Sequence, residues 1–175
     1  ITRTMTRSGR HFMSCVVFWV LDGDKIRGEG TQLMKFQTFG DEHLEDPRAL
    51  VTDDGRLFLA LTCWRKAVPG LYAHQCFGGV SDSFEMTAPQ HPVYGRNTNH
   101  LLRNRGAEKN WVYFQHDGLF HFAYSLQPHT IGEVHPEGIK EHKSVWNSEL
   151  WKWGEPRGGS PPVRVGEEYF GFFHS

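Results

Sequence analysis

Three segments of the chain repeat one pattern: a short strand, a tight turn that carries glycine, and a second strand rich in aromatic residues. The segments are 45–62, 109–125 and 158–174, with turn glycines Gly55, Gly118 and Gly166. Strand-like runs on either side of a glycine turn predict β-hairpins. A recurring hairpin with polar residues at the mouth of its first strand is typical of β-propeller blades, where those residues surround a central pocket. The sequence therefore predicts an all-β fold made of propeller blades.

The length of the chain sets how many blades it can hold. It has 175 residues, which is the size of one domain. A blade takes roughly 40–50 residues, so residues 1–175 are expected to form a single β-propeller domain or fragment of about three to four blades. The chain starts at Ile1 and stops directly after the third hairpin. We therefore expect an incomplete ring: either a fragment of a larger parent protein, or a chain whose ring is completed by something else.

The amino-acid composition further limits the fold class and the kinds of partner that we expect. Thirteen Phe, six Trp and five Tyr lie among nineteen Gly and nine Pro, which favours short strands and frequent turns over helices. The net charge of −1 argues against a nucleic-acid partner, and no apolar run is long enough to span a bilayer. The three cysteines lack metal-type spacing, so buried reduced thiols are favoured over a disulfide. The sequence does not indicate a compartment.

The remaining segments either precede the first repeated hairpin or connect one repeated hairpin to the next. Residues 12–21 and 25–35 flank Asp22-Gly23, a strong hairpin signal, and residues 1–11 are expected to be a lead-in or an outer strand of a preceding blade. Residues 72–86 are expected to form one or two outer strands, split at Gly78-Gly79. The Asn-, Arg- and His-rich segment 88–108 reads as a connection between blades.

The first hairpin opens with Glu45, Asp46, Pro47 and Arg48. Pro47 cannot donate a ladder hydrogen bond and suits the first position of a strand. Since side chains alternate along a strand, Asp46 and Arg48 should share one face while Glu45 points elsewhere. Such a pair is either a structural ion pair or, if buried, a proton donor with a neighbouring cation.

The other two hairpins open with different polar groups. Lys109, Asn110 and Trp111 would suit a sugar that stacks on the indole, or an anion held by Lys109, and the alternative is a solvated Lys beside a core Trp. Gly159 and Ser160 would let the backbone approach a ligand closely, or form an ordinary loop. His129 and His174 follow the second strands of the second and third hairpins.

These motifs together resemble a known group of enzymes. The Glu45–Arg48 hairpin, the Gly159-Ser160-Pro161-Pro162 segment and the ending at Phe173-His174 are similar to five-bladed β-propeller carbohydrate enzymes, most closely the β-mannoside phosphorylases and mannosidases of glycoside hydrolase family 130. The resemblance implies that Asp46 is the proton donor over the glycosidic bond. It also implies that basic residues hold inorganic phosphate as a co-substrate in the phosphorylases, for which Lys109 and Arg48 are the counterparts. The second hairpin departs from the family pattern.

Three roles follow from this interpretation, of which the last is a transferase accessory region or a structural part of a larger assembly. The first is a glycoside hydrolase or phosphorylase acting on a mannoside, with Asp46 as general acid and no cofactor apart from phosphate. Its substrate-binding residues are Glu45, Arg48, Lys109, Asn110, Trp111, His129, Gly159, Ser160 and His174. The second is a propeller module that binds a glycan or a protein without catalysis, because one fold hosts many functions. The sequence contains no phosphate loop, no nucleophile elbow and no metal-ligand spacing of His135, Glu141 and His142.

Overall fold

Every regular element that the structure describes is a β-strand. The computed structural model describes residues 2–8, 11–32, 43–67, 70–83, 86, 109–143 and 151–175. Within these ranges no helix is long and apolar enough to cross a membrane. The all-β expectation is therefore confirmed for the described residues. The predicted connection 88–108 lies outside them.

The strands form successive antiparallel sheets in sequence order. The first sheet contains β1 (Thr2–Ser8), β2 (His11–Asp22) and β3 (Lys25–Gln32), and the second contains β4 (His43–Val51), β5 (Leu57–Ala67) and β6 (Gly70–Val80). The third contains β7 (Val112–His116), β8 (Leu119–Leu126), β9 (His129–His135) and β10 (Gly138–Lys143). In each sheet neighbouring strands are consecutive in the chain. The predicted hairpin around Asp22-Gly23 is confirmed. Residues 2–8 pair with β2 in the same sheet, so the expectation of a lead-in or a strand of a preceding blade is wrong for them.

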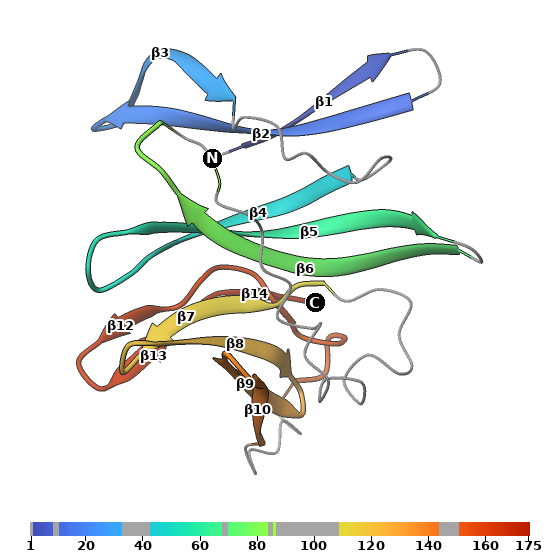
Figure 1. Cartoon of the computed structure of the whole chain (residues 1–175). Coiled ribbons are helices and arrows are strands. Elements are labelled where there is room, and N and C mark those ends of the chain that lie inside the picture. The colour runs from blue at the N-terminus through green and yellow to red at the C-terminus, as the bar shows by residue number, and fades with distance from the viewer. Residues whose placement is uncertain are drawn as a thin grey trace.

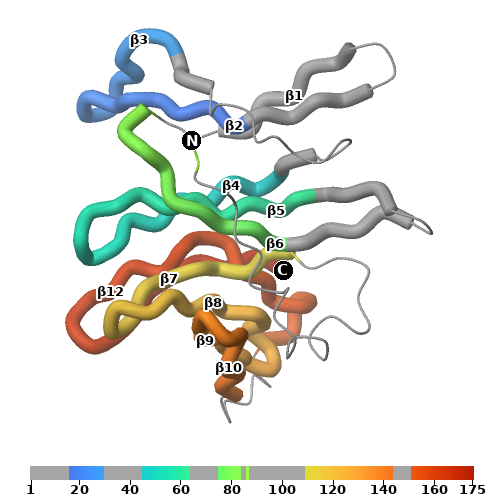
Figure 2. Tube along the Cα trace, viewed as in Figure 1, coloured from blue at the N-terminus to red at the C-terminus, as the bar shows by residue number. Residues whose placement is uncertain are grey.

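The C-terminal segment forms one interrupted hairpin. Its first arm holds β11 (Arg157–Gly158) and β12 (Val163–Val165), and its second arm holds β13 (Glu168–Phe170) and β14 (Phe173–His174). β11 pairs with β14, and β12 pairs with β13. Figures 1 and 2 show the sheets lying one above the next, with this C-terminal hairpin beside β7. None of the described sheets closes on itself.

Two hydrophobic cores hold the sheets together, one on each face of the second sheet. Val16 and Phe18 of β2 pack with Leu59, Leu61 and Cys63 of β5 in the first core. The second core joins the other face of the second sheet to the third sheet and contains Ala60, Phe77, Trp111, Tyr113 and Phe122. This division follows from strand alternation, because Leu59 and Leu61 point to one face of β5 and Ala60 to the other. The second sheet is thus buried on both sides.

Cys63 and Cys76 form a disulfide between β5 and β6. Cys63 pairs with His74 in the ladder, so Cys76 is its diagonal neighbour on the same face, with the two Cα atoms 6.7 Å apart. The expectation of reduced thiols is wrong for this pair. Spacing along the chain did not indicate that the β5–β6 register brings these cysteines together.

Candidate functional site

Arg48 joins the mouths of the three repeated hairpins. Its Nε donates to the Gly159 carbonyl at 2.9 Å, its Nη1 to the Trp111 carbonyl at 3.0 Å, and its Nη2 to the Gly158 carbonyl at 2.9 Å. Nη2 also lies 3.4 Å from the Asn110 side-chain oxygen. These bonds use four of the five N–H groups of the guanidinium. We call this group of residues the Arg48 junction.

The backbone around the junction is shaped for close approach. A Cβ atom on Gly158 would overlap the Val112 side chain and the Asn110 carbonyl oxygen, and one on Gly159 would lie 2.8 Å from the Phe172 carbonyl oxygen. Gly158 therefore lets the first arm of the C-terminal hairpin lie against β7, and Gly159 lets the two arms of that hairpin approach each other. Both residues present their carbonyls to Arg48. The close approach that the sequence predicted for this segment occurs, but its partner is the protein's own backbone.

Asp46 lies at a bulge in β4 and is exposed to solvent. The pairing of β4 with β5 shifts between Glu45 and Arg48, and Asp46 has a φ of 49°, in the left-handed region. The bulge breaks the simple alternation that was expected to put Asp46 and Arg48 on one face. The Asp46 carboxylate nevertheless interacts electrostatically with the Arg48 guanidinium. Burial lowers the pKa of the Arg48 guanidinium, and the Asp46 charge raises it.

The second hairpin contributes one carbonyl oxygen, that of Trp111, and one side-chain oxygen, that of Asn110, to the junction. The Trp111 side chain is only 1% exposed and stacks on Phe122, with ring centroids 4.4 Å apart. The ring is thus a core side chain and not a platform for a sugar. Asn110, with a φ of 66°, directs its side-chain oxygen to Arg48. Lys109 is exposed beside it.

The remaining predicted residues occupy different places. Glu45 is half-buried and pairs with Thr62. Ser160 lies just past the junction, where its hydroxyl oxygen accepts a hydrogen bond from the Phe172 N–H at 3.0 Å. His174 is exposed and pairs with Arg157 at the end of the C-terminal hairpin.

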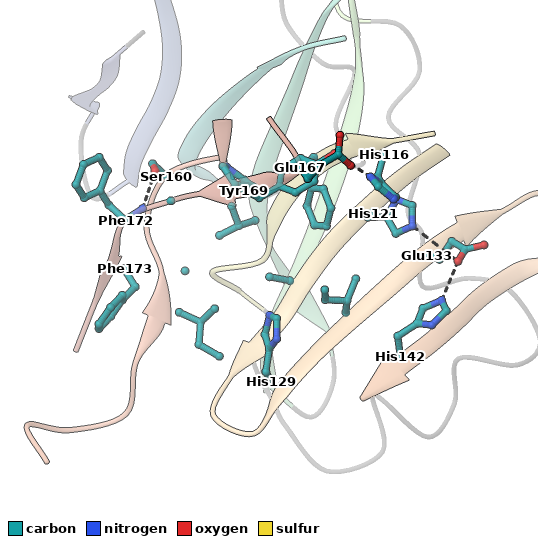
Figure 3. A pocket seen from close by; sticks show the side chains of 18 residues that line it. His116, His121, His129, Glu133, His142, Ser160, Glu167, Tyr169, Phe172 and Phe173 are labelled. Atoms are coloured by element: carbon teal, nitrogen blue, oxygen red, sulfur yellow. Dashed lines mark hydrogen bonds and ion pairs between the residues drawn. The ribbon is translucent and has the colours of Figure 1, made fainter. Parts of the chain in front are cut away.

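His129 and Ser160 belong to a pocket of about 670 Å³ between the third sheet and the C-terminal hairpin. Figure 3 shows His129 on one side of this pocket and Tyr169 on the other. Its floor is the face of the third sheet that does not contact the second sheet. Burial lowers the pKa of His129, which favours the neutral imidazole there. The two residues were predicted beside Asp46, but they line this pocket with Gly158 and not the bulge.

One end of the pocket holds a carboxylate surrounded by basic groups, which the sequence analysis did not identify. Glu133 Oε2 lies 2.7 Å from His142 Nε2 and 3.7 Å from His121 Nε2 (Figure 3). Glu133 Oε1 also contacts His135 Nε2. The hydrogen bond from His142 is the largest cause that lowers the pKa of Glu133. Burial lowers the pKa of His121. Strand alternation could have revealed part of the cluster, because Glu133 and His135 share a face of one strand.

The Arg48 junction and the pocket offer different chemistry. The Arg48 junction is a set of structural hydrogen bonds beside the exposed Asp46 carboxylate. The pocket is an apolar recess with imidazoles at its edge. Among the residues that the structure describes, no group of three or more His, Cys, Asp or Glu side chains is arranged to hold a metal ion. No protein-family model, curated protein or solved structure matches this chain.

Proposed function

We propose that the chain is part of a carbohydrate-active β-propeller that hydrolyses or phosphorolyses a glycoside, with Asp46 as the general acid. The observation that supports this proposal is the Arg48 junction, in which one side chain of the first repeated hairpin bonds both of the others. Blades arranged around an axis would bring the mouths of successive hairpins together in this way. The face-to-face stacking of sheets in sequence order is also what successive blades would give.

Asp46 is exposed in the free chain, so the proposal requires the bound glycoside to cover the carboxyl group and favour its protonated form. Asp46 then gives its proton to the glycosidic oxygen as the bond from that oxygen to the anomeric carbon breaks. In hydrolysis a water oxygen bonds to the anomeric carbon and a base takes the water proton. In phosphorolysis a phosphate oxygen forms that bond, and no separate base is needed. Exposed Lys109 is the proposed phosphate contact. Arg48 is not, since carbonyl and amide oxygens already engage four of its five N–H donors.

The test is to incubate the full chain with manno-oligosaccharides, with and without phosphate, and to measure free sugar and sugar phosphate. We expect Asp46→Asn to lower turnover by about 100-fold or more, the range typical for loss of a general acid. Asp53→Asn is the matched control, because Asp53 is an exposed carboxylate at the far end of the same hairpin. Equal turnover of Asp46→Asn and the native chain would remove Asp46 from the reaction.

The alternative is a module that binds a glycan or a protein without catalysis. It is favoured by the engagement of Arg48 in structural hydrogen bonds, which leaves Asp46 and Lys109 as the exposed charged groups at the first two hairpin mouths. Binding on a glycan array with no product formed, and loss of that binding in Lys109→Ala, would favour this module over the enzyme.

A further inference from the structure

Another cavity, of about 430 Å³, lies between the second and third sheets. Phe58, next to the turn of the first repeated hairpin, lines one side, and Phe120, next to the turn of the second, lines the other. The two turns lie on the same side of the molecule (Figure 1), where the Asp53 N–H donates to Gln115. All of the lining residues lie between positions 56 and 136, so neither end of the chain borders this cavity.

The strand register explains why there is space here. Phe58 of β5 pairs with Gly79 of β6, so the two positions share one face of the second sheet. Phe77, two residues earlier on β6, is buried on this face against the third sheet. A side chain at position 79 would therefore lie beside the Phe58 ring, inside the cavity. Glycine leaves that space open.

Three phenylalanine rings form the apolar wall of the cavity. The ring centroids of Phe58 and Phe120 are 4.6 Å apart and those of Phe77 and Phe120 are 5.5 Å apart, with both pairs tilted by 55°. Tilted rings present faces and edges to the space between them, which is the arrangement that a further aromatic ring prefers. The volume lies within the range of small-molecule sites. The cavity therefore suits a ligand with one aromatic ring.

Arg56 places a guanidinium at the edge of the cavity. Its Cζ lies 5.7 Å from the centroid of the Phe58 ring, and its Nε donates to Asp54 at 2.7 Å. Its two terminal NH₂ groups have no hydrogen-bond partner among the residues that the structure describes. These groups form a planar fork that matches a carboxylate. His135 also lines the cavity, but its Nε2 contacts Glu133, so Arg56 is the main contact for an anion.

We propose that this cavity binds a small carboxylate that carries an aromatic ring. The ring packs among the three phenylalanines, and the carboxylate accepts hydrogen bonds from the terminal NH₂ groups of Arg56. A neutral ligand would not use the charge of this fork, and an amine would be repelled by it. The site is independent of the function proposed for Asp46, which lies at the other end of the same hairpin.

The test is an NMR titration of the full chain with phenylpropionate. We expect saturable shifts of the Gly79 and Phe120 amides and nuclear Overhauser contacts from the ligand ring to the Phe58 ring. Phenylpropanol keeps the ring without the charge, and it should bind at least about 10-fold more weakly because it cannot accept a charge-assisted pair of hydrogen bonds. Propionate keeps the charge without the ring, and it should give no saturable shift at Gly79.

Three variants test the two parts of the site. Arg56→Gln removes the fork and should weaken phenylpropionate binding by about 10-fold or more. Arg27→Gln is the matched control, because Arg27 is equally exposed and pairs with Asp22 away from the cavity. It should leave the affinity unchanged. Gly79→Val fills the cavity beside Phe58 and should block binding.

Four results would overturn the proposal. They are the absence of saturable shifts with phenylpropionate, equal binding of phenylpropanol, equal affinities of Arg56→Gln and Arg27→Gln, and native affinity in Gly79→Val. None of these results depends on turnover of a glycoside, so they are separate from the test of Asp46.

Discussion

At the scale of single residues, Arg48 has the most consequential contacts. It links the second sheet to two segments more than 60 positions along the chain, through carbonyls of Trp111, Gly158 and Gly159. We predict that Arg48→Lys lowers the free energy of unfolding by about 2–4 kcal/mol, because an ammonium cannot reproduce the planar fork and leaves partly buried carbonyls without donors. Chemical denaturation of the two proteins, followed by circular dichroism, measures the difference.

Arg56→Lys is the matched control for this substitution. Arg56 belongs to the turn of the same hairpin, and its side chain is 67% exposed while it pairs with Asp54. Exposed pairs contribute little, so we expect a change below about 0.5 kcal/mol. Equal losses for the two variants would mean that the junction bonds do not stabilise the fold.

Single residues also show which features of the candidate site could be predicted from the sequence. The cluster Glu45–Arg48 was identified as important from its polar residues at a hairpin mouth, and Arg48 does meet the other two mouths. The direction of its side chain was not predicted, because the bulge at Asp46 changes the alternation. Proline suits a bulge as well as the first position of a strand, and the structure places Pro47 inside β4 at the bulge, not at the start of the strand. The role of Trp111 could not be predicted from its residue type. A buried core ring and a ring that stacks on a sugar both call for a large aromatic side chain.

At the scale of elements, Gly132 in β9 shows how tightly the third sheet is packed. A Cβ atom there would lie 2.9 Å or less from three ring atoms of Phe122, which is fully buried beneath Trp111. We predict that Gly132→Ala lowers the free energy of unfolding by about 1–3 kcal/mol through overpacking, although alanine suits a strand better than glycine. Thermal unfolding monitored by near-ultraviolet circular dichroism would report both the loss and the altered aromatic packing.

Gly171→Ala provides the comparison within the C-terminal hairpin. The nearest atom to a Cβ at Gly171 is 3.5 Å away, an ordinary van der Waals contact, and its backbone is not in the left-handed region. We expect its stability to stay within about 0.5 kcal/mol of the native chain. A Gly132→Ala variant as stable as Gly171→Ala would show that Phe122 can move aside.

The hairpins themselves were predictable, whereas their partners were not. Asp22-Gly23, Gly55 and Gly118 marked turns that the structure contains, because a tight turn needs a backbone conformation that few residues adopt. Pairing between hairpins depends on register and on which face is buried. For that reason the Cys63–Cys76 disulfide and the Glu133 cluster emerged only from the strand pairing.

At the scale of the whole molecule, the second sheet couples the others. Its Leu59 and Leu61 complete the first core, and its Ala60 and Phe77 complete the second. The tip of its first hairpin also reaches the third sheet, where the Asp53 N–H donates to the Gln115 side-chain oxygen at 2.8 Å. Separating either outer sheet from the second therefore exposes a core that the second sheet shares.

This arrangement predicts that the described sheets unfold as one cooperative unit. Leu59→Ala, at a fully buried site of the first core, should lower the free energy of unfolding by about 2–5 kcal/mol. If the sheets are coupled, the free energy of amide opening should fall by the same amount in β2, β5 and β8, although Leu59 is not part of the core that contains β8 residues. Native-state hydrogen exchange of the full chain in low denaturant measures all three strands at once. A drop confined to β2 and β5, with β8 unchanged, would show that the third sheet keeps its structure after the first core is lost, and the sheets would then be separate folding units.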